Sequence, residues 1–221
     1  MATVTKGKEG KVYLINKPDA PQSMIVAAHV TEGNGQPEEI AIETVLRNFG
    51  GMATSRLNRN LRLDKHWSYG TSGILTGVRG QRLFLVRAPV QTDKTKESMQ
   101  EITKEIRGLA GEHPIAGEDY ASVMRSGTLR LPGRFATLNA LDGAAVQMIK
   151  YGLSDDYWSK YAERVRGLQA KDLNEAVKKF VRPDEVVWLI VGDRRKVENN
   201  VKSLGLGEVI VLDTNGRVLT K

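Results

Sequence analysis

Two pairs of closely spaced strand patterns constrain the fold of this 221-residue chain more than any other feature. Residues 11–16 and 23–31 are rich in apolar and β-branched side chains, and only a short turn at Lys17-Pro18 separates them. Residues 67–76 and 82–90 form a second pair of the same kind. A parallel connection needs a dozen or more residues, so consecutive strands this close together predict antiparallel pairing.

Helical patterns fill most of the remaining chain. The clearest one begins at Thr92 or Asp93, either of which we expect to cap it, and ends before Pro114. Because these helices must cover one face of the sheet, we predict a single α+β domain over residues 1–221, with a mostly antiparallel β-sheet covered on one face by a layer of helices. Further helices are expected at residues 37–51, 54–64, 117–131, 133–151, 155–168, 171–180 and after Asp193, and further strands at 185–191, 209–211 and 218–219.

The composition excludes several classes of protein. The chain has no cysteine, which excludes a disulfide scaffold, a thiol nucleophile and any cysteine-ligated metal. The longest apolar runs, near residues 24–30 and 186–191, are shorter than the roughly 20 residues that a membrane-spanning helix needs. Residues 1–10 are polar, so we expect no leader segment there. The compartment stays open, and a bacterial periplasmic location would follow only if the full-length protein carries a signal peptide.

The net charge of +7, from 33 basic and 26 acidic residues, raises the question of nucleic acid. Most basic residues stand beside acidic ones, and the one local excess is Arg56, Arg59, Arg62 and Lys65, whose spacing places them on one helix face. A solvated basic face explains this pattern better, because no aromatic platforms are interleaved with the cations. A nucleic-acid-binding module is therefore kept only as a remote alternative.

The motifs of an autonomous enzyme are missing. No glycine-rich nucleotide loop is found, and the residues around Ser72 do not complete the G-x-S-x-G pattern of a nucleophile elbow. The histidines His29, His66 and His113 cannot form a helical zinc pair, because no two of them lie one turn apart. We expect His29 to be a strand residue of the core or surface and His113 to be exposed. The chain alone is thus predicted to bind no metal or cofactor and to catalyse no reaction.

Arg62 and Tyr69 are the remaining candidates for chemistry. An arginine that ends a helix and a tyrosine that enters the next strand can project into the same space. The pair would offer a guanidinium fork for a carboxylate or carbonyl and a phenol that can donate to an oxyanion. From the residues alone, an ordinary structural pair is the better explanation, with Tyr69 as a half-buried strand residue and Arg62 as a surface residue.

An ordered set of motifs around these two residues resembles the pitrilysin/insulinase family of zinc metallopeptidases. Its core is Gly50-Gly51, Ser55-Arg56-Leu57, Asn60-Leu61-Arg62 and then Tyr69 after six intervening residues, as in the non-catalytic second half of that family. The resemblance covers about residues 10–215 and relates the chain to the subunits of mitochondrial processing peptidase. Other matching segments are Pro21-Gln22-Ser23, residues 131–135, 151–157 and 182–184, Val191-Gly192-Asp193 and residues 204–207.

The resemblance implies a role in a two-part enzyme. In this family, two homologous halves or subunits enclose a chamber, and the first half holds zinc through an H-x-x-E-H motif. Carried over, Arg62 would bind the substrate backbone or its carbonyl, and Tyr69 would stabilise the tetrahedral oxyanion in trans. The implied partners are a homologous zinc-bearing half or subunit and a peptide substrate, with a homodimer as a further expected pairing in isolation. Zinc would belong to the partner half.

The chain departs from the family pattern at His66, where the family usually has glycine. Glycine takes a positive φ freely and histidine does so less easily, so we expect the conformation of this loop to depend on that replacement. Some relatives have lost activity and act as scaffolding subunits in larger assemblies. A scaffolding or assembly subunit without a catalytic contribution is therefore the main alternative to a catalytic partner.

Overall fold

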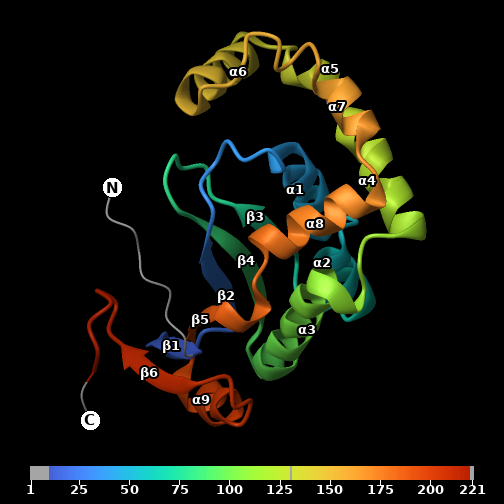
Figure 1. Ribbon diagram of the computed structural model, residues 1–221. Helices are drawn as coiled ribbons and strands as arrows, with labels where there is room; N and C mark the ends of the chain where they lie inside the picture. Colours follow the sequence, from blue (N-terminus) through green and yellow to red (C-terminus); the bar gives the residue numbers. More distant parts are fainter. Residues whose placement is uncertain (1–9, 130, 220–221) are drawn as a thin grey trace.

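The computed structural model describes residues 10–129 and 131–219, and in them a six-stranded sheet has the order β3-β4-β2-β5-β1-β6 (Figure 1). Residues 1–9, where we expected no leader, lie outside the described part. The strands are β1 (Lys11–Asn16), β2 (Gln22–Thr31), β3 (Ser72–Leu75), β4 (Arg82–Gln91), β5 (Val187–Gly192) and β6 (Glu208–Leu212).

The sheet is mixed, with three antiparallel and two parallel pairings. The antiparallel pairs are β3–β4, β4–β2 and β2–β5, and the parallel pairs are β5–β1 and β1–β6. The second pair of strand patterns thus forms the expected hairpin. The expectation that the first pair would be neighbours is wrong, because β5 lies between β1 and β2. As a continuous apolar run, β5 takes an interior position and is paired on both edges.

One face of the sheet carries the core. Side chains in register across the strands, such as Ile25, Ala27 and Val86, are fully buried against the helices. The opposite face is partly open, and Met24 and Leu83 there are 38% and 39% exposed. The expected single layer of helices is therefore confirmed. It consists of α1 (Glu39–Leu46) with η1 (Arg47–Gly51), α2 (Arg56–Asn58) with η2 (Arg59–Asp64), α3 (Thr95–Arg107) with η4 (Gly108–Glu112), α8 (Ala170–Phe180) and α9 (Arg194–Lys202).

A helical arm extends from this layer and curves past the β3 edge (Figure 1). It consists of α4 (Gly117–Leu129), α5 (Leu131–Arg134), α6 (Leu138–Tyr151) and α7 (Tyr161–Gly167). A second apolar cluster, which includes Ile40 and Tyr161, fastens α7 to α1. Residues 133–151 do not form one helix, because Thr137 caps a new helix by accepting a hydrogen bond from the Ala140 amide at 3.2 Å. Short 3₁₀ turns, η3 (Thr92–Lys94) and η5 (Pro183–Glu185), precede α3 and β5.

No helix in the described ranges is both long and apolar enough to span a bilayer.

Candidate functional site: the Arg62–Tyr69 loop

Two buried leucines fix the helix that carries Arg62. Leu57 and Leu61 stand one turn apart, a spacing that places both on the same side of a helix, and both are fully buried. The helical segment continues from α2 into η2 and ends at Asp64. Arg62 therefore projects from the opposite, exposed side of this segment.

The chain then turns back on the end of η2. The amides of Trp67 and Ser68 both donate to the Leu61 carbonyl, at 2.9 and 3.2 Å. His66 has φ of 57°, a left-handed conformation that favours glycine. His66 thus takes the backbone conformation that a glycine at this position would adopt easily. Tyr69 follows at the surface, with 86% of its area exposed.

Asn58 and Ser68 attach this loop to its surroundings. The Asn58 Oδ1 atom accepts from the Thr71 amide at 2.7 Å, and its Nδ2 atom donates to the Thr71 carbonyl at 3.0 Å. The Ser68 hydroxyl donates to the Pro89 carbonyl of β4 at 2.6 Å. The segment that carries Tyr69 is therefore anchored at both ends, to the Asn58 side chain at one end and to the backbone of β4 at the other.

Two glycines set the distance between η1, the segment before this helix, and the sheet edge. A Cβ atom on Gly50 would lie 2.1 Å from the Gly73 amide nitrogen, which no side chain can tolerate. A Cβ atom on Gly73 would lie 2.8 Å from the Phe49 ring. The backbone of η1 is thus packed directly on β3.

Arg62, His66 and Tyr69 line one cavity of about 430 Å³. The structure therefore brings the two sequence-predicted residues together, although their roles stay a prediction. Throughout residues 10–129 and 131–219, no hydrogen bond or ion pair involves the side-chain polar atoms of these three residues. The remaining lining residues are Gln22, Leu63, Trp67, Ser68 and Gln91, and none of the eight is acidic.

Sequence reasoning missed Gln22 and Gln91 as members of the cavity. They are direct partners in the β2–β4 register, at the sheet end nearest the loop. The Gln91 Nε2 atom also donates to the His66 carbonyl at 3.2 Å. The sequence does show a polar residue at the end of each of the two strand patterns. Whether these two residues lie side by side depends on the strand register, which the sequence alone does not fix.

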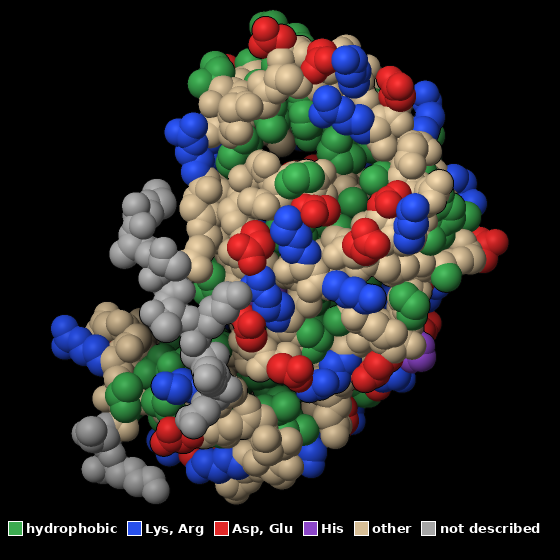
Figure 2. Space-filling model, in the orientation of Figure 1, with side chains coloured by type: hydrophobic (Ala, Val, Ile, Leu, Met, Phe, Trp, Pro, Cys, Tyr) green, Lys and Arg blue, Asp and Glu red, His purple; other side chains and the backbone are tan. Residues whose placement is uncertain are grey.

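Two of the four cations of the predicted basic face, Arg56 and Lys65, are paired with acids within the described fold. Arg56 Nε lies 3.4 Å from Glu105, and Lys65 Nζ lies 3.6 Å from Glu101, both acids being on α3. On the face of the molecule shown in Figure 2, Lys and Arg side chains are likewise interspersed with Asp and Glu. This arrangement matches a solvated, partly paired face and gives nucleic acid no continuous basic track on the side shown.

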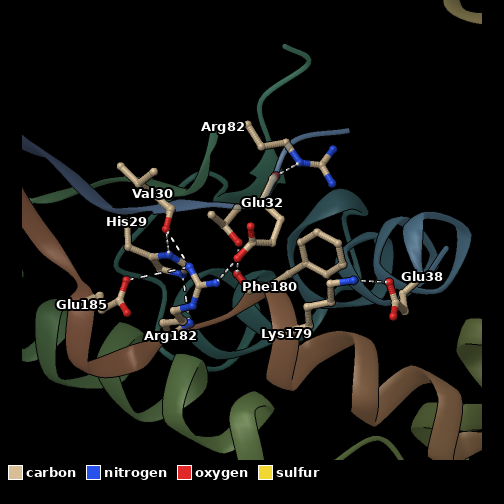
Figure 3. A network of polar contacts seen from close by, with 10 residues as sticks. His29, Val30, Glu32, Glu38, Arg82, Lys179, Phe180, Arg182 and Glu185 are labelled. Atoms are coloured by element: carbon tan, nitrogen blue, oxygen red, sulfur yellow. Dashed lines mark hydrogen bonds and ion pairs between the residues drawn. The ribbon is translucent and has the colours of Figure 1, made fainter. Parts of the chain in front are cut away.

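His29 is part of a structural network at the end of β2 (Figure 3). It is 3% exposed, its ring stacks on Phe84 at 5.0 Å, and its Nε2 atom accepts from the Arg182 amide at 3.0 Å. Arg182 also donates to the Val30 carbonyl and pairs with Glu32. His29 is thus a core histidine, and the described residues contain no group of three side chains that could hold a metal ion.

A larger cavity of about 570 Å³ lies elsewhere, between α6, α1 and the β3 edge. Figure 2 shows the surface hollowed below the arm. Glu43 faces this cavity, and burial, with a smaller effect of Glu39, raises the pKa of its carboxyl. Neither Arg62 nor Tyr69 reaches it, so it is separate from the predicted site.

Solved structures of other proteins share this fold, among them the following three. The peptidase M16 inactive domain from Pseudomonas fluorescens matches with a TM-score of 0.75 at 16% identity, over 87% of this chain and 46% of that one. The periplasmic protease PqqL from Escherichia coli gives a TM-score of 0.68 at 13% identity, over 86% and 21%. A chain of Complex III2 from Candida albicans gives 0.66 at 12% identity, over 89% and 49%. The present chain thus spans half or less of each of these chains.

Among curated proteins, no sequence matches this chain. A family match does exist, to the peptidase M16 inactive domain, over residues 2–121. The matched segment is more than half of the chain and includes the whole loop with Arg62, His66 and Tyr69. On this match, the chain belongs to the peptidase M16 inactive-domain family.

Proposed function

We propose that this chain is the non-catalytic half or subunit of a zinc metallopeptidase and supplies Arg62 and Tyr69 to a peptide-hydrolysing site completed by a zinc-bearing partner. The observation that carries the proposal is the shared cavity. On a chain of the inactive-domain family, the two side chains line one space without acidic groups and without internal partners. Such donors are available to a ligand that enters from outside.

The chemistry divides between the two halves. Zinc in the partner would polarise the substrate carbonyl and activate water. The Arg62 guanidinium would hold the peptide backbone through its fixed fork of N–H donors. The Tyr69 phenol would donate to the oxyanion that develops in the tetrahedral state, where a positioned donor is most effective.

The test is reconstitution with the zinc-bearing half, meaning the chain or segment that carries H-x-x-E-H. Tyr69→Phe is expected to lower kcat by about 10²- to 10³-fold, the usual effect of removing one oxyanion donor. Arg62→Ala should lower kcat/KM strongly. Arg59→Ala is the matched control, because Arg59 is exposed on the same helical segment and does not line the cavity. The proposal fails if Tyr69→Phe and Arg62→Ala both leave the reconstituted activity unchanged.

A scaffolding subunit is the second candidate. A chain of Candida albicans Complex III2 has the same fold, so the fold is compatible with a place in a large assembly. This candidate predicts stable association with a partner and no effect of either substitution on any peptide hydrolysis. The same reconstitution therefore separates the two functions.

A further inference from the structure

His66 has an unusual backbone that its neighbours hold in place. Of the non-glycine residues in the described ranges, only His66 and Asp19 have a positive φ. The Gln91 side chain donates to the His66 carbonyl at 3.2 Å, and the amides on both sides, of Lys65 and Trp67, donate to carbonyls of η2. Such over-determined conformations gather at functional sites, so the residue in this position calls for a functional explanation.

His66 lines the same cavity as two other residues whose donors are unused. Arg62, His66 and Tyr69 all line the cavity of about 430 Å³, and in the described chain none of their side-chain polar atoms has a hydrogen-bond partner. An arginine offers N–H donors only, and an imidazole offers at least one in either tautomer. The cavity therefore presents an excess of donors to whatever fills it.

The rest of the lining fits an anionic group on an organic chain. Leu63 and Trp67 supply apolar walls, and the amides of Gln22 and Gln91 stand on the strand side. No acidic residue faces the cavity. A carboxylate has two oxygens that only accept, whereas a carboxamide replaces one of them with a donor that would oppose these donors. The cavity should thus distinguish the two.

We propose that this cavity is a carboxylate-binding subsite in which His66, together with Arg62, selects peptides that carry an acidic side chain or a free C-terminus. The inference rests on the proposed function for its choice of a peptide as ligand. His66 acts here as a specificity-determining residue, in addition to the predicted backbone contact of Arg62. Gln91 acts as a positioning residue, because it holds the His66 carbonyl.

The test measures binding to the 221-residue chain by NMR titration, without any zinc-bearing partner. The probes are short alanine peptides blocked at both ends with a central glutamate or glutamine, and all-alanine peptides with a free or an amidated C-terminus. We expect at least one carboxylate peptide to bind on the order of tenfold more tightly than its amide counterpart, as a charge-assisted hydrogen bond should allow. The pair that shows this preference identifies the source of the carboxylate.

Variants then assign the preference to the cavity. His66→Gly keeps the backbone conformation and should reduce the tenfold preference to about twofold, and Arg62→Ala should abolish it. Arg59→Ala removes the same charge outside the cavity and should leave the preference intact. Equal binding of acids and amides, or an undiminished preference in His66→Gly, would overturn the inference. Because no hydrolysis is measured, such a result would leave the proposed function standing, and a failed reconstitution would leave this binding result standing.

Discussion

Asn58 and Thr71 are joined by a reciprocal pair of hydrogen bonds, 2.7 Å from the Thr71 amide to Oδ1 and 3.0 Å from Nδ2 to the Thr71 carbonyl. The pair links the helix that bears Arg62 to the strand that follows Tyr69. Because Thr71 is itself only 8% exposed, water is largely kept from its two backbone groups, and both depend on Asn58. The geometry of the site is thus maintained by a side chain that does not line the cavity.

Asn58→Ala should lower the free energy of unfolding by about 2–4 kcal/mol, since it leaves two buried backbone groups of Thr71 without partners. Urea denaturation followed by circular dichroism measures this loss. Asn139→Ala, at an exposed position on α6, is the control and should change stability by less than about 0.5 kcal/mol. A loss at Asn58 no greater than that of the control would contradict the anchoring role.

His66→Gly should raise the free energy of unfolding by up to about 1 kcal/mol. The left-handed conformation at φ of 57° costs a residue with a Cβ atom roughly 1–2 kcal/mol, and glycine avoids it at some cost in unfolded-state entropy. His113→Gly makes the same change at a φ of −135° and should not stabilise the protein. Thermal denaturation of both variants checks the contrast, and equal shifts in Tm would argue against strain at His66.

Arg82→Met should destabilise the fold by about 3–5 kcal/mol, because Arg82 and Glu39 form a buried bidentate pair with both contacts at 2.8 Å. Removing the arginine leaves the Glu39 carboxylate buried next to Glu43. The double variant Arg82→Met with Glu39→Leu should recover much of the loss. Urea denaturation of the three proteins measures it.

The exposed pair of Arg125 and Glu118 is the matched control for this comparison. Its atoms lie 3.8 Å apart and its side chains are 66% and 95% exposed. Arg125→Ala should therefore change stability by no more than about 1 kcal/mol. A double variant at Arg82 and Glu39 that is as unstable as the single one would show that the loss does not come from an unpaired charge.

Glu198 should make the folded state sensitive to acid. Hydrogen bonds from Arg194 and then Lys202 lower the pKa of Glu198 from 4.5 to about 2. A lowered pKa means that the stabilisation is complete above about pH 4.5 and is lost as the pH falls through about 2. Glu198→Gln should flatten the dependence of stability on pH in this window. Glu208→Gln, at an exposed position outside this cluster, should not do so.

The sequence predicted the local structure of the site better than its surroundings. The spacing of Leu57 and Leu61 was enough to place Arg62 on the exposed side of its helix. The pairing of Gln22 with Gln91 was not predictable, because it depends on strand register between segments some seventy residues apart in the chain. The neutralisation of Arg56 by Glu105 likewise arises only when α2 meets α3.

Capping shows the same limit of local reasoning. Thr92 was expected to cap the long helix, but its hydroxyl donates to the Ala20 carbonyl at 2.8 Å, and α3 begins at Thr95 after a 3₁₀ turn. The Thr92 hydroxyl is therefore used in a tertiary contact and not in the helix cap that the local pattern predicts. Asp193, by contrast, caps α9 as expected, with its carboxylate accepting from the Arg195 amide at 3.1 Å.

The contact between Gly50 and Gly73 leaves no room for the turn after α1 to slide on the edge strand. Together with the hydrogen bond from Ser68 to the Pro89 carbonyl of β4, this contact ties the segment that carries Arg62, His66 and Tyr69, the wall of the cavity, to the sheet. Two consequences follow for any enzyme built with this wall. Its selectivity has to evolve through exchange of side chains at positions such as 66, and its access has to be controlled by displacement of the entire domain.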